Sequence, residues 1–453
     1  MSDRHSISVI DFYQQFHCLG ASCPKTCCFG WVILVDDDSH AARKREKGLY
    51  GLILRIFLKP RKDSFPCIRL LMGHCPHHIH GLCQMQVRGR PDLMPMICRT
   101  YPRRNVDFGP DTEITLELSC VEAARVFLEN ADHRLHFVPV LSGKKPEAGH
   151  LDGIEDALSH QDVNRLAVDS TDDLKLTEYE TLWKQENEDP SFLSFLRRSR
   201  EEMLDLLWER DASQVVEVED ILFDYVRRIH RLIVRDHIPE AMEEKILVPL
   251  DEAEKRDYHG GPDVKPDRAL FFPISILNDV IYNQVPFWEE ALKDLDFFRL
   301  LVLYRRKIGR LEEDKADKII QSWYEEMVRE NPEIEKKYRA YLSYCMQEMW
   351  CNAYEDYHVL RQFIYAAVCL DLLKICDILA SKSLRTTKSG MYTKKDKGLS
   401  GEASQRGDGN LNKGNRFSIA EEVRVLSASE RGFRHSIYIR DSFLDLIRRK
   451  ILS

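Results

Sequence analysis

The segment FHCLGASCPKTCCFGW, residues 16–31, places four cysteines within eleven residues, and two of them are adjacent. This density of thiols exceeds what packing alone requires, since a buried free cysteine acts as one small hydrophobic residue among many. The spacing Cys18-x4-Cys23-x3-Cys27-Cys28 puts four sulfurs in one short irregular segment, where they can converge on a site. Thiolates select zinc, copper(I) or iron–sulfur clusters over hard cations, so the segment indicates metal binding.

A second set of thiols follows. Cys75, Cys83, Cys98 and Cys120 offer four more sulfurs, and Cys67 lies nearby. Four cysteines suffice for a cubane iron–sulfur cluster or for a closed tetrahedral zinc site. The paired CxxC knuckles of a zinc finger and the C-x2-C-x2-C run of a ferredoxin are both absent from this sequence. Spacing alone therefore leaves the metal and the identity of its ligands open.

Histidines lie among these cysteines. They are His17, His74, His77, His78 and His80. Imidazole also binds zinc and iron, so these side chains could complete a mixed ligand set. The alternative is that they are ordinary polar residues of loops.

The composition limits the class of protein. With 453 residues, a net charge of -8 and a pI near 6.1, the chain is not the basic protein expected of a nucleic-acid binder. The N-terminus lacks a basic segment that leads into an apolar run, so no secretory signal is indicated. No uncharged apolar stretch reaches the length of a membrane span. We expect a cytoplasmic protein with reduced thiols, no membrane contact and no nucleic-acid partner.

The sequence predicts a mainly α protein in which a small irregular Cys-rich metal-binding module precedes an α-helical body. The module covers 1–140 and the body 150–380, with a polar boundary at 142–153. Residues 381–416 carry six glycines and an excess of basic residues, which predicts a flexible basic loop. The remaining segment, 417–453, is expected to pack on the helical body.

Periodicity predicts the individual elements. Alternation of apolar and polar residues predicts a strand over 113–119, a second candidate strand covers 31–36, and a helix is expected over 121–130. Apolar residues at 3.6-residue spacing predict helices over 191–210, 218–236, 287–308, 315–329, 334–357 and 358–380. A loop is expected over 253–268. Four late cysteines fall within the helical pattern and are interpreted as buried small hydrophobic residues: Cys345, Cys351, Cys369 and Cys376.

The Cys-rich part resembles a known family. The segment at 16–31, followed by GLC, CRTYPRR and LSCVEAARVFL, is similar to the flagellin lysine-N-methylase (FliB-like) family and to proteins with a zinc- or iron-chelating Cys cluster. A Cys doublet ahead of Gly-Trp and a C-R-x-Y-P-R block, followed by an L-S-C-x-E-A-A-R block, form a specific combination. The strong similarity covers about residues 16–128.

The resemblance implies a protein-lysine N-methyltransferase that transfers methyl groups from S-adenosylmethionine to lysine ε-amines, with flagellin as the substrate. It also implies an iron–sulfur cluster of the 4Fe–4S type, with zinc as the alternative. The implied ligands are Cys18, Cys23, Cys27, Cys28, Cys75, Cys83, Cys98 and Cys120. The alternative function is a non-catalytic zinc- or iron-binding protein with a structural or redox-sensing role. The oligomeric state and the catalytic residues are not indicated.

The sequence gives weak independent support for methyl transfer. The Gly-rich turn of the common S-adenosylmethionine fold needs a preceding strand, and Gly407-Asp408-Gly409 has no apolar run before it. A donor site is therefore expected between the Cys-rich module and the helical body. Aromatic side chains could enclose the donor sulfonium, although the later ones suit a core: Trp31, Tyr101, Tyr341, Tyr344, Trp350 and Tyr354. Arg99, Arg103 and Arg104 either contact cluster sulfurs or form surface ion pairs.

Overall fold

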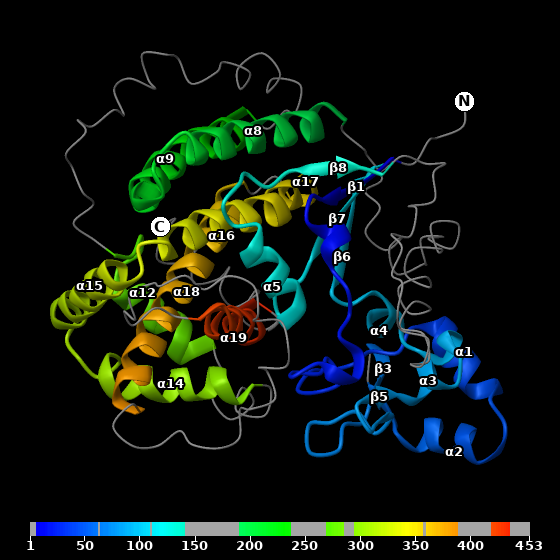
Figure 1. Ribbon diagram of the computed structural model, residues 1–453. Helices are drawn as coiled ribbons and strands as arrows, with labels where there is room; N and C mark the ends of the chain where they lie inside the picture. The colour runs from blue at the N-terminus through cyan, green and yellow to red at the C-terminus, as the bar shows by residue number, and fades with distance from the viewer. Residues whose placement is uncertain are drawn as a thin grey trace, which may run out of the picture.

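The computed structural model describes most of the chain. The described residues are 6–61, 64–108, 111–140, 190–236, 269–284, 294–356, 359–387 and 418–434. Outside them lie the predicted boundary at 142–153, the predicted loop at 253–268, and most of the predicted basic loop and C-terminal segment. Figure 1 shows a helical body, a sheet at its side and a Cys-rich lobe below the sheet.

A four-stranded sheet is formed by the beginning and the end of the N-terminal 140 residues. Its strands are β1 (Ser6–Ile10), β6 (Arg103–Phe108), β7 (Asp111–Leu116) and β8 (Phe137–Pro139), in the order β6-β7-β1-β8. β1 is parallel to β7, and the other two pairings are antiparallel. The predicted strand over 113–119 is confirmed as β7, and the predicted helix over 121–130 is confirmed as α5 (Val121–Glu129).

The other predicted strand, over 31–36, is wrong. Within this described segment a single β-bridge forms, between Leu34 and Cys67. Ile33 and Val35 are buried in a small apolar cluster, whereas Val32 is exposed. The alternation therefore reflects one-sided burial of an extended loop and not pairing within a sheet.

Helices dominate the described chain from residue 190 onward, and the predicted mainly α fold is confirmed. They are α8 (Pro190–Trp208), α9 (Val215–Asp236), α12 (Ile274–Asp279), α14 (Leu295–Lys307), α15 (Glu313–Glu330), α16 (Ile334–Met349), α17 (Ala353–Asp356), α18 (Val359–Thr387) and α19 (Ile419–Ser429). Each helix predicted for the body falls on one of these. No helix in the described ranges has the length and the apolar run that crossing a lipid bilayer would require.

Two helix ends differ from the prediction. α18 continues to Thr387, so residues 381–387, predicted as the start of the flexible loop, are helical. The helix predicted over 334–357 is interrupted, because α16 ends at Met349 and a 3-10 turn, Trp350–Asn352, precedes α17. The turn carries the fully buried Trp350, whose Nε1 donates to Ser199 Oγ at 3.0 Å.

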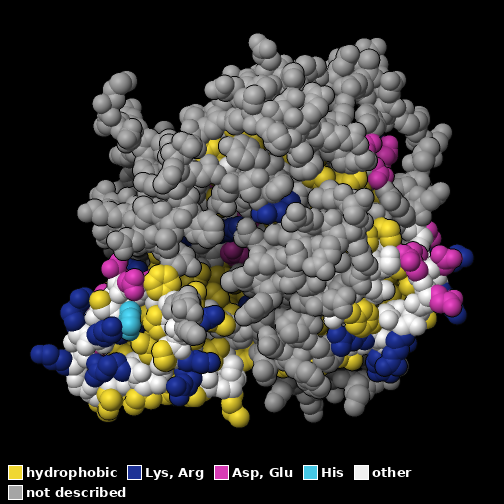
Figure 2. All heavy atoms as spheres, turned by 180° about the vertical axis from the view of Figure 1, so that it is seen from behind, with side chains coloured by type: hydrophobic (Ala, Val, Ile, Leu, Met, Phe, Trp, Pro, Cys, Tyr) yellow, Lys and Arg dark blue, Asp and Glu magenta, His cyan; other side chains and the backbone are white. Residues whose placement is uncertain are grey.

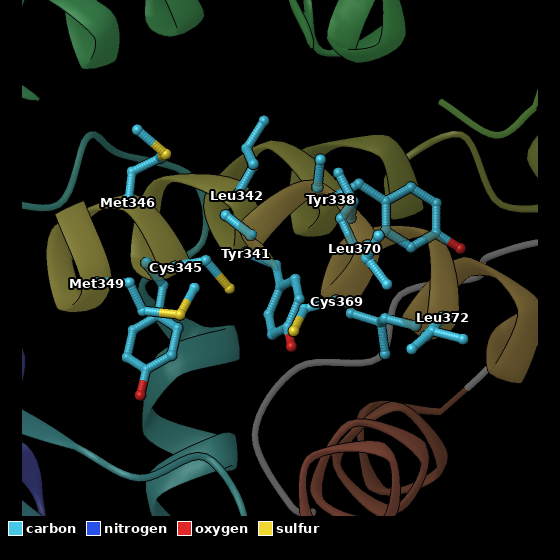
Figure 3. Packing of buried hydrophobic residues seen from close by; sticks show 14 of the residues in the cluster. Tyr338, Tyr341, Leu342, Cys345, Met346, Met349, Cys369, Leu370 and Leu372 are labelled. Carbon is cyan, nitrogen blue, oxygen red and sulfur yellow. The ribbon is translucent and has the colours of Figure 1, made fainter. Parts of the chain in front are cut away.

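α16 and α18 form the centre of the core, where Tyr341 and Cys345 lie in one apolar cluster with Cys369 and Leu370 (Figure 3). Both helices bury side chains around most of their circumference, which is typical of a helix at the centre of a protein. The four late cysteines are buried here, as predicted: Cys345, Cys351, Cys369 and Cys376. The sheet contributes to the same core through residues of β1, β7 and α5.

Buried ion pairs tie these parts together. Arg200 of α8 donates to Glu113 of β7 at 2.7 Å, which links the sheet to the helical body. Lys337 of α16 donates to both carboxylate oxygens of Asp377 of α18, each at 2.9 Å. An ion pair of this kind stabilises little relative to apolar packing, but the loss of one partner leaves an uncompensated buried charge.

The Cys-rich lobe, defined here as residues 17–101, is inserted into the chain between β1 and β6 (Figure 1). Its elements are α1 (Asp37–Arg45), α2 (Gly48–Ile56), β2 (Leu58–Arg61), β3 (Ser64–Ile68), β4 (His78–Ile79), β5 (Leu82–Cys83), α3 (Gln84–Val87) and α4 (Met96–Thr100). The strands form two separate hairpins, β2-β3 and β4-β5.

The lobe has little apolar core of its own. One cluster contains Ala42, Leu54, Met85, Leu93 and Met94. The other contains Ile33, Val35, Ile68 and Cys75. Several large apolar side chains of the lobe are exposed instead, among them Leu49, Ile56 and Met72. In Figure 2 the lobe lies at the lower left, where hydrophobic and basic side chains are interspersed on the surface. So small a core rarely holds a fold without crosslinks.

The Lys337–Asp377 pair gives a stability test with a neighbouring control. We expect Lys337→Met to lower the free energy of unfolding by about 3–5 kcal/mol, since Asp377 would keep a buried unpaired charge. Lys336→Met removes the exposed pair with Glu333 and should cost about 0–1 kcal/mol. Urea denaturation of both variants measures the difference. If both variants lost the same free energy of unfolding, burial of the Lys337–Asp377 pair would not explain its contribution.

Candidate metal centre

All thirteen cysteines are free thiols, and the eight candidate ligands lie in or beside the lobe. Cys18 and Cys23 flank the 3-10 turn Gly20–Ser22, and the adjacent pair Cys27–Cys28 follows in the same loop. Three others are set by short elements: Cys75 precedes the β4-β5 hairpin, Cys83 caps α3, and Cys98 lies within α4. Cys120 caps the N-terminus of α5, outside the lobe.

The sheet brings three of these thiols together. β1 and β7 are parallel, so the loops that leave their C-terminal ends emerge at the same edge of the sheet. Cys18 and Cys23 follow β1, and Cys120 follows β7. The Cys120 thiol interacts electrostatically with those of Cys23 and Cys18, and burial raises the pKa of Cys120 to about 12. We call Cys18, Cys23 and Cys120 the first thiol group.

The second thiol group is Cys75, Cys83 and Cys98. The Cys98 thiol interacts electrostatically with both of the others, and its burial raises its pKa well above the ordinary value. Burial likewise raises the pKa of Cys75 to about 11. Cys83 and Cys98 pack against the same apolar cluster of α1, α2 and α3. Without a metal these thiols hold their protons at neutral pH.

The adjacent pair lies between the two groups. The hydrogen bond between the two side chains, followed by burial, raises the pKa of Cys27 well above its ordinary value. Cys27 interacts with Cys18 in the first group and with Cys98 in the second. Cys28 packs against the apolar cluster that contains Cys75, and its carbonyl accepts the Cys75 N–H at 2.8 Å. The pair therefore connects the two groups.

Backbone N–H groups converge on the sulfurs. The Gly20 N–H donates to Cys18 Sγ at 3.5 Å. N–H groups two and three residues farther along the chain lower the pKa values of the Cys75, Cys83 and Cys120 thiols, against the larger effect of burial. Such donors favour the thiolate over the thiol and tune the potentials of metal–thiolate centres.

The donor set fits a metal, although the thiols are not at ligand distances. Within the described parts of the chain, no three His, Cys, Asp or Glu side chains are close enough together to hold a metal ion as they stand. Protonated thiols have no reason to converge, because metal sites form together with the metal that binds them. Of the eight candidate ligands, Cys75 is buried, Cys18 and Cys27 are exposed, and the other five are half-buried. Thiols in this number suit zinc or an iron–sulfur cluster. Cys67 is buried in the β2-β3 hairpin, apart from both groups.

One of the five histidines stands out. The ring of His77 is 1% exposed, and its Nε2 has no hydrogen-bond partner. Burial, with Arg43 nearby, lowers the pKa of His77 to about 4, so the imidazole is neutral. His78 is hydrogen-bonded to Thr26 and His17 to the Gln15 carbonyl, whereas His74 and His80 are exposed. His77 is therefore the histidine best suited to ligate a metal.

Arg43 is a residue that sequence reasoning missed. It is 1% exposed, its Nε donates to the Leu93 carbonyl at 2.8 Å, and its Nη1 has no partner. Among the described residues no carboxylate pairs with it. The thiolates of the second thiol group could supply negative charge, because all three of these side chains interact with Arg43. A buried guanidinium needs such a counter-charge.

The lobe meets the helical body through a second missed set of residues. Lys25 Nζ donates to Asp294 at 2.8 Å and lies 2.6 Å from Asp296, both at the start of α14. Arg431 donates to the Ser119 carbonyl at 2.8 Å and to the Lys25 carbonyl at 3.2 Å. It also interacts with Cys23. The sequence could not predict this contact, because Lys25, Ser119, Asp294 and Arg431 come from four segments that are far apart in the chain.

The aromatic candidates separate into two kinds. Trp31 and Tyr101 form a ring pair at 5.6 Å, and Trp31 Nε1 donates to the Cys27 carbonyl. The others are buried in the main core, where they pack as hydrophobic residues: Tyr341, Tyr344, Trp350 and Tyr354.

The three candidate arginines also separate. Arg103 lies near the Cys18 thiol and donates to the Tyr13 hydroxyl. Arg104 pairs with Glu348 of α16 at 2.9 Å. Arg99 is exposed on α4. Of the three, Arg103 is therefore the one placed to interact with a thiol of the first group.

Comparisons of the chain with known protein families, with curated proteins and with solved structures give no match. The thiols, the residues around them and the sequence similarity described above are therefore what indicates a function. The site lies where the lobe, the edge of the sheet and the start of α14 meet.

The Lys25 contact can be tested against a matched control. We expect Lys25→Met to make backbone amides of residues 18–31 exchange hydrogen about ten- to a hundredfold faster, because a hydrogen bond to a charged group contributes about 1.5–3 kcal/mol. Arg299→Met removes a pair with the same Asp296 from its exposed side and should leave exchange in 18–31 unchanged. Unchanged exchange in both variants would show that Lys25 does not hold the lobe.

Proposed function

We propose that this chain is a protein-lysine N-methyltransferase whose Cys-rich lobe holds a thiolate-ligated iron–sulfur cluster. The observation that carries the proposal is the gathering of eight thiols from five separate segments beside the helical body. The family resemblance supports the reaction and its donor, S-adenosylmethionine, with flagellin as the implied substrate. The cluster, when bound, would supply a rigid crosslink and a redox centre.

The position of Trp31 and Tyr101 supports a donor site beside the thiols. A sulfonium is a cation and is attracted to the faces of aromatic rings. Burial raises the pKa of Tyr101 well above its ordinary value, so its hydroxyl is neutral; it lies 3.0 Å from Ser119 Oγ. A neutral phenol can donate or accept a hydrogen bond without competing for the positive charge of the donor.

The reaction requires little beyond orientation and a neutral amine. The lysine nitrogen forms a bond to the methyl carbon as the bond from that carbon to the donor sulfur breaks, which leaves a thioether. The methylated ammonium then loses a proton to solvent or to a carboxylate. A partly desolvated junction lowers the pKa of an incoming lysine and so favours attack.

A second function is supported by the size of the lobe's core. Two small apolar clusters give residues 17–101 little stabilisation, so a bound metal would stabilise the lobe as a crosslink even without catalysis. The protein would then be a non-catalytic metal–thiolate protein with a structural or redox-sensing role. It would bind metal but not the methyl donor.

Anaerobically purified full-length protein tests the proposal. We expect iron and acid-labile sulfide in equal amounts, calorimetric binding of S-adenosylmethionine, and transfer of labelled methyl groups to lysines of flagellin. Zinc alone, without sulfide, would contradict the iron–sulfur cluster. Metal-loaded protein that binds no donor would overturn the methyltransferase and leave the structural crosslink.

The donor site has its own variant test. Trp31→Ala should weaken S-adenosylmethionine binding about two- to thirtyfold, since a cation–π contact contributes about 0.5–2 kcal/mol. Trp31→Phe should restore part of the affinity. Trp323→Ala, in α15, removes an aromatic ring under Lys382 far along the chain and should not change the affinity. Equal affinities of all three variants would place the donor elsewhere.

A further inference from the structure

We propose that the thiols hold two metal centres, each built from one thiol group and one member of the adjacent pair. The first centre comprises Cys18, Cys23, Cys27 and Cys120. The second comprises Cys28, Cys75, Cys83 and Cys98. This inference rests on the proposed metal binding and adds its stoichiometry and the division of its ligands.

The two thiol groups have separate structural origins. The first is assembled at the edge of the sheet, by the loops that follow the parallel strands β1 and β7. The second is assembled inside the lobe, by the β4-β5 hairpin and by α3 and α4. Each group supplies three sulfurs, one fewer than a closed tetrahedral zinc site or a cubane cluster requires.

The adjacent pair supplies the two missing ligands. Cys28 belongs to the second group, because it packs with Cys75 and Cys98 against the same apolar cluster and its carbonyl accepts the Cys75 N–H. Cys27 lies in the loop of Cys18 and Cys23, and Arg431 ties this loop to the Cys120 segment by donating to the carbonyls of Lys25 and Ser119. With Cys28 assigned to the second centre, Cys27 completes the first.

Each group also has its own cation. Arg43 is buried with an unpartnered Nη1, and its Nη2 donates to Met85, which belongs to the apolar cluster against which Cys83 and Cys98 pack. Arg103 interacts with Cys18, and Arg431 with Cys23, in the first group. Four thiolates carry more negative charge than one divalent ion neutralises, so a nearby cation stabilises each centre.

The test counts metal in full-length protein purified without oxygen. Wild type should hold about eight iron atoms as two 4Fe–4S clusters, or about two zinc ions if zinc is the metal. The double variants Cys18→Ser/Cys120→Ser and Cys83→Ser/Cys98→Ser should each keep half of that metal. Cys67→Ser, which changes a buried cysteine outside both groups, should keep all of it.

Arg43→Met provides a variant that leaves every thiol in place. We expect it to weaken or remove metal at the second centre alone, which the spectrum of the Cys18→Ser/Cys120→Ser background would show. Zinc titration of reduced, metal-free wild type should reach its end point at two equivalents per chain, independently of how the variants fold.

Several results would overturn the inference. One equivalent of zinc, half the expected iron in wild type, or complete loss of metal from either double variant would show a single centre. Absence of metal in every preparation would overturn both the inference and the proposed cluster. Two centres in a protein that transfers no methyl group would leave the inference intact and overturn only the methyltransferase.

Discussion

The parallel pairing of β1 with β7 is the constraint on which the site depends. It fixes both ends of an 85-residue lobe, residues 17–101, on one sheet, and it makes the loops after the two strands emerge side by side. Cys18 and Cys120, about a hundred residues apart in sequence, meet for this reason. The same sheet joins the core of the helical body through Glu113 and Arg200, so the thiols at its edge are positioned by the most deeply buried part of the protein.

The two parts of the molecule are stabilised differently. The helical body is held by apolar packing around α16 and α18, with buried ion pairs such as Lys337–Asp377 oriented within it. The lobe has two small apolar clusters, short hairpins and exposed hydrophobic side chains. Its buried polar groups include the Cys75 thiol, the His77 imidazole and the Arg43 guanidinium, which has no carboxylate partner among the described residues. Metal–thiolate bonds are the interactions that would give this composition a stable structure.

Periodicity in the sequence was sufficient for much of the fold. The helices of the body and α5 follow from apolar residues at helical spacing, and β7 from alternation. The segment 31–36 shows the limit of alternation, because one-sided burial of a loop produces the same pattern as an edge strand. The cysteines marked the site, but their division into groups depends on a parallel strand pairing that no local pattern reveals. Arg43, Lys25 and Arg431 carry no signal of their own in the sequence, since an arginine or lysine side chain is ordinarily exposed to solvent.

The carboxylate of Asp294 both caps α14 and binds Lys25 of the lobe, so the start of this helix depends on the lobe. It accepts the N–H groups of Asp296 and Phe297 as the N-cap of α14, and it receives Lys25 from the lobe while nearly inaccessible to water. If the lobe loosened, this side chain would keep its cap and the Arg431 guanidinium, 3.5 Å away, but would lose Lys25. In the proposed metal-bound protein, the first turn of α14 would therefore be coupled to the lobe through Lys25, and oxidation of the thiols that loosened the lobe would weaken the start of this helix.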